Sequence, residues 1–172
     1  MKKFLNYFIT VCAVIIGLFA VVEGIQSLYQ KYHNNTAQVS SSSKQEMIVY
    51  LQQIAPIAEQ VSGTIQEVAP VLDQAADPSK KEMTLAKVKS ATAQFVSYKN
   101  QAAHVQAPQA VKNLHQQWVD AIGSYVGAFQ QASSGVAEGN KEKISEGISM
   151  LEKGSKQFND VSQEIARQVP EK

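Results

Sequence analysis

The spacing of apolar residues constrains the fold of this chain more than any other feature. From residue 44 onward, apolar side chains recur at alternating intervals of four and three residues, which places them on one face of an α-helix. The first such series is Met47, Leu51, Ile54, Ala58, Val61, Ile65, Val68, Leu72 and Ala75. A seam of this length predicts a helix that packs against other helices, so we expect an all-α fold.

Three further segments repeat this spacing, and each boundary between segments carries a helix start or stop signal. Asp77 is expected to cap a second helix, and Pro108 opens a third. Gly139 is expected to end the third helix in a left-handed conformation, and Asn140 to cap a fourth. Four amphipathic helices with short connections predict an up-and-down four-helix bundle over residues 44–172. The alternative is a three-helix bundle in which prolines split one helix.

Two prolines interrupt the first helical segment, in the similar contexts IAPIAEQ and VAPVLDQ. Pro56 and Pro70 each lack the amide hydrogen that a helix uses, so the helix should bend at both. One interpretation is a pair of fixed bends that wrap a long helix around its neighbours, and the other is a hinge. We favour fixed bends, because proline is a common cause of static kinks.

Charge is divided unevenly between the first two helical segments. Residues 44–77 contain one lysine and five acidic residues, whereas residues 78–106 contain five lysines and one glutamate. This division favours an antiparallel hairpin of the two, although exposed ion pairs contribute little to stability. The net charge of the whole chain is only +1. No strongly basic surface is therefore expected, and nucleic-acid binding is excluded as a function.

An uncharged apolar segment at residues 4–22 predicts a membrane anchor. Its 19 residues would cover about 28 Å as a helix, which is close to the thickness of a bilayer's hydrocarbon core. Lys2 and Lys3 precede the segment, and this bias places the N-terminus in the cytoplasm and the bundle outside. We therefore expect a single-pass protein of the cell membrane whose residues 1–31 form the anchor. The alternative is secretion after signal-peptide cleavage.

Two features near the anchor need separate interpretation. Cys12 lies within the apolar segment, and the residue before it, Val11, is too large for a lipoprotein processing site, so lipidation is not expected. Residues 32–43 are rich in Asn, Thr and Ser, which favour local hydrogen bonds over regular structure. They are interpreted as a flexible tether between the anchor and the bundle.

The third helical segment combines aromatic side chains with unusually little charge. Between residues 113 and 137 the only charged residue is Asp120, and Trp118, Tyr125 and Phe129 are interleaved with three glycines. One interpretation is that this helix is the most buried of the bundle. The other is a partner-binding face, because Trp and Tyr are enriched at binding hot spots. We favour burial, because large aromatics at helical spacing usually belong to a core.

No catalytic, metal or cofactor site is predicted. His104 and His115 lie on either side of the turn at Pro108, with Asp120 near the second, but a metal site needs three or four converging ligands. Both histidines are expected on the surface. The sequence has no nucleophile elbow and no phosphate-binding glycine loop. We therefore expect a protein that is not an enzyme.

A family resemblance is carried by the last two helical segments, PQAVKNLHQQWVDAIGSYVGAFQQ and NKEKISEGISMLEKGSKQF. They resemble small exported helical proteins and lipoproteins of the Gram-positive cell envelope, many of which have no known function. The resemblance implies placement in the bacterial cell envelope rather than a particular activity. Our hypothesis for the function is that the anchored bundle binds another envelope protein, for envelope scaffolding or phage exclusion. The alternative function is an extracytoplasmic bundle that senses a ligand and signals through a partner.

Overall fold

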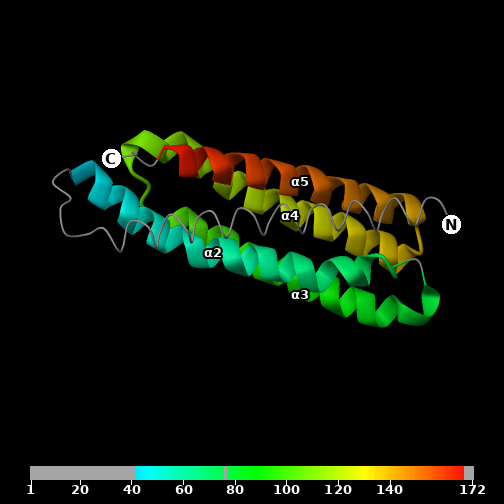
Figure 1. Cartoon of the computed structure of the whole chain (residues 1–172). Helices are drawn as coiled ribbons and strands as arrows, with labels where there is room; N and C mark the ends of the chain where they lie inside the picture. The colour runs from blue at the N-terminus through cyan, green and yellow to red at the C-terminus, as the bar shows by residue number, and fades with distance from the viewer. Residues whose placement is uncertain (1–41, 76, 169–172) are drawn as a thin grey trace.

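The computed structural model describes residues 42–75 and 77–168, and in this part of the chain it is an elongated bundle of four antiparallel helices (Figure 1). The helices are α2 (Ser42–Leu72), α3 (Lys81–His104), α4 (Lys112–Glu138) and α5 (Lys141–Arg167). Two short 3-10 turns, η2 (Pro78–Lys80) and η3 (Gln109–Val111), precede α3 and α4. The predicted all-α four-helix bundle is confirmed.

The predicted helix boundaries are confirmed at the atomic level. The carboxylate of Asp77 accepts a hydrogen bond of 2.9 Å from the backbone amide of Ser79, at the start of the turn that leads into α3. Asn140 caps α5 in the same way, because its side-chain oxygen accepts hydrogen bonds from two amides of the first turn. Gly139 ends α4 with a φ of 68°, the left-handed conformation that favours glycine. The sequence therefore encodes both ends of the α4–α5 connection.

Helix α2 runs without interruption through both of its prolines. It begins at Ser42 and ends at Leu72, with Pro56 and Pro70 inside it and both exposed. The alternative of a proline-split helix is therefore wrong. The helix also begins two residues before residue 44, where the bundle was predicted to start, so it includes the last two residues of the predicted tether. Fixed bends at the two prolines remain a prediction, with a hinge as the alternative.

The closest packing in the bundle is between α4 and α5, and it depends on small residues. A Cβ atom placed on Gly147 of α5 would lie 2.6 Å from the backbone nitrogen of Ala132 on α4. A Cβ atom on Gly135 of α4 would lie 2.6 Å from the backbone nitrogen of Ile144 on α5. Real Cβ contacts are not this short, so glycine is required at both positions. The glycine at position 135, one of the three between residues 113 and 137, thus permits the two helix backbones to approach closely.

Helices α2 and α3 are neighbours, as their opposite charges suggested, but ion pairs do not hold them together. Their contact uses the side chain of Thr64, whose hydroxyl lies 2.8 Å from Gln94 Oε1 and 3.0 Å from the hydroxyl of Tyr98. The ion pairs among the described side chains join Lys143 to Glu138, Lys156 to Asp160, and Arg167 to Glu164. All three ion pairs lie within α5 or between α4 and α5. The opposite charges of α2 and α3 therefore predicted that these two helices are neighbours, but not the contact that joins them.

The membrane anchor predicted at residues 4–22 lies outside the described residues, as do Cys12 and most of the predicted tether. None of the helices between residues 42 and 168 combines the length and the apolar character that a membrane crossing requires. The anchor therefore remains a prediction from the sequence.

Candidate functional site

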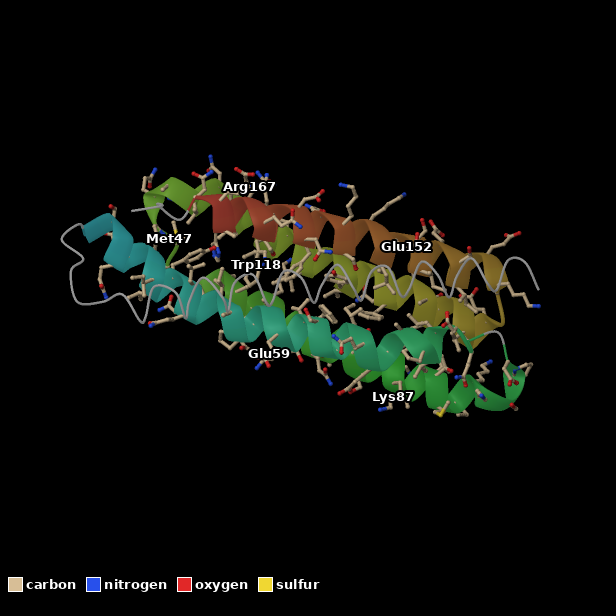
Figure 2. The ribbon with its side chains drawn as sticks, in the orientation of Figure 1. Met47, Glu59, Lys87, Trp118, Glu152 and Arg167 are labelled. Carbon is tan, nitrogen blue, oxygen red and sulfur yellow. The ribbon has the colours of Figure 1, made fainter. Side chains whose placement is uncertain are left out.

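The three aromatic residues proposed for partner binding lie in the interior of the bundle. Trp118, Tyr125 and Phe129 are each 0% exposed, and Figure 2 shows Trp118 between the helices. Phe95 of α3 lies with its ring centre 4.8 Å from that of Tyr125 and 5.3 Å from that of Phe129. A partner cannot contact these rings while the bundle is closed. Of the two interpretations, burial therefore agrees with the structure, and the partner-binding face does not.

Two buried serines on α5 satisfy the polar atoms of these aromatics. The indole nitrogen of Trp118 donates a hydrogen bond of 3.1 Å to the hydroxyl of Ser162. The hydroxyl of Tyr125 donates one of 3.0 Å to the hydroxyl of Ser155. The two aromatics are seven residues apart on α4, and the two serines are seven residues apart on α5. The two hydrogen bonds therefore fix the register of these antiparallel helices. A buried donor without a partner would cost free energy, and these serines remove that cost.

His115 is buried, which corrects the prediction that it lies on the surface. It is 8% exposed, and its Nδ1 lies 3.2 Å from the hydroxyl of Tyr50 on α2. The ring stacks on Trp118 at a centre distance of 6.2 Å. Burial lowers the pKa of His115, and a hydrogen bond from the ring to the backbone of Ala102 on α3 partly opposes this shift. His115 thus ties α4 to two other helices. His104 is exposed, as predicted.

The histidine was misplaced because its position in the sequence gives no sign of burial. It follows the apolar residue Leu114 directly. It is covered by Tyr50, the ring of Trp118 and the backbone of α3, and its neighbours in the sequence do not reveal these contacts. Burial also raises the pKa of the Tyr50 hydroxyl. Both groups are therefore neutral near pH 7, and the pair is a hydrogen bond between uncharged side chains.

A cleft of about 530 Å³ lies beside this pair, between the start of α2 and the connection from α3 to α4. Its lining residues are Gln45, Glu46, Val49, Tyr50, Gln53, Gln106, Ala107 and Pro108. Val49 is 42% exposed, although it is a large apolar residue. The cleft therefore offers an apolar contact surrounded by amide groups and one carboxylate, which suits a protein segment or a polar small molecule.

A second, much smaller cavity of about 30 Å³ lies deeper, between α2, α4 and α5. Its walls are mainly apolar, with Ile65 and Leu72 on α2, Phe129 on α4, and Leu151 on α5. Partial burial raises the pKa of Glu152, which lines the rim of this cavity. A space of this size holds about one water molecule, so it is a packing defect of the core rather than a ligand site.

The described residues offer no arrangement for metal chemistry. No group of three or more His, Cys, Asp or Glu side chains in this part of the chain is placed to hold an ion. His104 and His115 do not converge, because the first hydrogen-bonds to the backbone of Asn100 and the second to Tyr50. The arrangement can bind through surface contacts, and its interior polar groups serve the fold.

Comparison of the chain with protein-family models, curated proteins and solved structures finds no match. Its function must therefore be inferred from its own residues.

Sequence reasoning missed the buried serines and the close approach at Gly147. Ser155 and Ser162 stand seven residues apart on α5, and Trp118 and Tyr125 stand seven apart on α4. This matched spacing was a usable signal, since a serine within an apolar seam can accept a hydrogen bond from a facing aromatic. Gly147 gave no comparable signal, because its role depends on which residue of α4 faces it.

Proposed function

We propose that this protein is a membrane-anchored, extracytoplasmic helical bundle that acts by binding another protein of the cell envelope. The uncharged segment at residues 4–22, preceded by Lys2 and Lys3, carries the proposal, because it suits a spanning helix that leaves the bundle outside. The biological role that fits best is envelope scaffolding or exclusion of phage.

The cleft beside Tyr50 is the best candidate for the binding surface. It lies at the start of α2, which is the end of the bundle next to the tether, so it would sit close to the membrane. A partner held in the same membrane could reach it, and the exposed Val49 would supply an apolar contact. Protein interfaces usually combine an apolar centre with a polar rim.

A photo-crosslinking amino acid placed at Gln106, in the wall of the cleft, tests this proposal in intact cells. We expect irradiation to join the chain to one envelope protein. The matched control is the same amino acid at Lys153, an exposed position on α5, which should give no such product. Equal crosslinking from both positions, or none from Gln106, would contradict a specific binding cleft.

A second candidate function is ligand sensing, and the volume of the same cleft favours it. Gln45, Gln53 and Gln106 present amide groups that could bind a polar small molecule. In that case the chain must signal through a partner. Thermal unfolding measured with a panel of small polar metabolites separates the two functions, because only a sensor would be stabilised by one of them.

A further inference from the structure

The face formed by α3 and α4 leaves two large apolar side chains exposed at the same level of the bundle. Val96 of α3 is 44% exposed, and Met150, which reaches α4 from α5, is 36% exposed. Gly127 of α4 lies beside Met150, and Gly123 of α4 lies beside Lys99 of α3. Single exposed apolar residues are ordinary, but these two flank one shallow stretch of helix surface.

Contacts within the chain fix the level of each residue along α3 and α4. Lys99 lies against Gly123, since its Nζ would be 3.1 Å from a Cβ atom on that glycine. Phe95 lies against Tyr125 and Phe129. The two helices are antiparallel, so Val96 is level with residues 126 and 127. Lys99 is likewise within one helical turn of Asp120.

The glycine positions are covered only by flexible side chains. Lys99 covers Gly123, and the terminal methyl of Met150 lies 3.6 Å from a Cβ atom placed on Gly127. Both side chains have several rotatable bonds, so they can move aside at low cost. Because glycine has no side chain, moving them aside would expose the backbone of α4 at Gly123 and Gly127, and we call this stretch the glycine notch.

The charges on this face have no ion-pair partner within the described part of the chain. Asp120 accepts a hydrogen bond from Gln116, and the ion pairs of the described residues involve neither Asp120 nor Lys99. The two residues have opposite charge, and both border the glycine notch. Val96, the glycine notch, Lys99 and Asp120 thus lie at about one level of the bundle. The same face on a second copy could therefore receive Val96 in its notch and pair its own Asp120 with Lys99.

We propose that this face binds a second copy of the chain in a parallel, twofold-symmetric dimer. A twofold axis along the bundle places α3 of one copy against α4 of the other. Val96 of each copy then enters the notch at Gly123 and Gly127 of its partner, and Lys99 of each copy pairs with Asp120 of the other. A symmetric dimer of this kind uses the same patch on both copies.

The charges also select this arrangement over the antiparallel one. An axis perpendicular to the bundle would place α3 against α3, and α3 contains four lysines but only one acidic residue, Glu82. Like charges placed opposite one another disfavour such an interface. In the parallel dimer both copies of α2 begin at the same end. Two copies anchored in one membrane could adopt it, and this last point alone rests on the proposed function.

Charge reversal tests the dimer in the full chain. Copies that carry two different tags are produced together, extracted in mild detergent and purified through one tag, and the recovery of the other tag is measured. We expect wild-type copies to co-purify. Lys99→Asp or Asp120→Lys should each reduce recovery about tenfold, because each places like charges opposite one another. The matched control is Lys153→Asp on the exposed face of α5, which should leave recovery unchanged.

Mixing the two reversed variants provides the decisive result. A Lys99→Asp copy offers two acids and an Asp120→Lys copy offers two bases, so together they should recover co-purification that neither shows alone. Circular dichroism of each variant checks that the bundle remains helical. Wild-type copies that do not co-purify, or a mixture that fails to recover, would overturn the dimer. Neither outcome would affect the proposed anchor or the crosslink at Gln106, which are measured separately.

Discussion

At the scale of single residues, substitution of Trp118 tests whether the aromatic residues Trp118, Tyr125 and Phe129 of α4 belong to the core. Trp118→Ala should lower the free energy of unfolding by about 3 to 5 kcal/mol, because it removes a fully buried ring and leaves a cavity. Denaturant unfolding of a soluble fragment that begins at residue 42 measures this change. Gln117→Ala is the control, since Gln117 is exposed and should change stability by no more than about 0.5 kcal/mol. Equal effects from the two substitutions would place Trp118 on the surface.

His115 predicts a dependence of stability on pH. Its pKa in the folded chain is below the ordinary value of 6.5, so the unfolded chain binds a proton more readily than the folded chain. The stability that this group confers is complete above about pH 6.5 and is lost as the pH falls through the two pKa values. Between about pH 7.5 and about pH 5.5, where carboxyl groups change little, the melting temperature should fall.

Substitution of the histidine should remove most of that dependence. The melting temperature of a His115→Gln variant should be lower at neutral pH, because the contact with Tyr50 is altered, but it should vary less over the same range. His104→Gln is the matched control, and it should keep the wild-type dependence because His104 is exposed. An unchanged slope in the His115→Gln variant would show that other groups cause the effect.

At the scale of helices, the two glycines Gly147 and Gly63 should respond to alanine in opposite ways. Both lie inside helices, where alanine is favoured over glycine by about 1 kcal/mol. Gly147 faces the backbone of Ala132, whereas a Cβ atom on Gly63 meets nothing within 4 Å. Gly147→Ala should therefore destabilise the bundle, and Gly63→Ala should stabilise it. Denaturant unfolding of the two variants checks the signs, and stabilisation by both would mean that α4 and α5 are not closely packed.

The helices themselves could be predicted from the sequence, because the signals are local. Asp77, Gly139 and Asn140 mark boundaries that the structure confirms, and the seam from Met47 to Leu72 is buried throughout. The contacts between helices were harder to predict. Gly147, Ser155 and Ser162 owe their roles to the residues that face them, and that pairing follows from the register of α4 against α5 rather than from the neighbours of each residue in the chain.

The candidate binding cleft was not predicted for the same reason. It combines the start of α2 with the connection from α3 to α4, which are about 60 residues apart in the sequence. Three of its eight lining residues are glutamines, which are common on any helix surface. The aromatic residues that stood out in the sequence instead form the core. In this bundle the most distinctive residue types hold the fold together, and ordinary ones line the surface available for binding.

At the scale of the whole molecule, the proposed anchor would hold the bundle outside the membrane with its cleft near the tether. The interior polar groups discussed above, on His115, Trp118 and Tyr125, are satisfied within the bundle. Binding should therefore occur through the surface, without the bundle opening.

The central claim is that residues 4–22 hold the bundle on the outer side of a membrane, and protease treatment of intact protoplasts tests it most directly. The chain is detected through a tag at the C-terminus, with a cytoplasmic protein as the control for intact membranes. We expect added protease to remove the tag while the cytoplasmic control survives, and we expect the mature chain to retain its original N-terminus. A bundle that stays protected until the membrane is dissolved, or a mature chain shortened at its N-terminus, would contradict the outward-facing anchor.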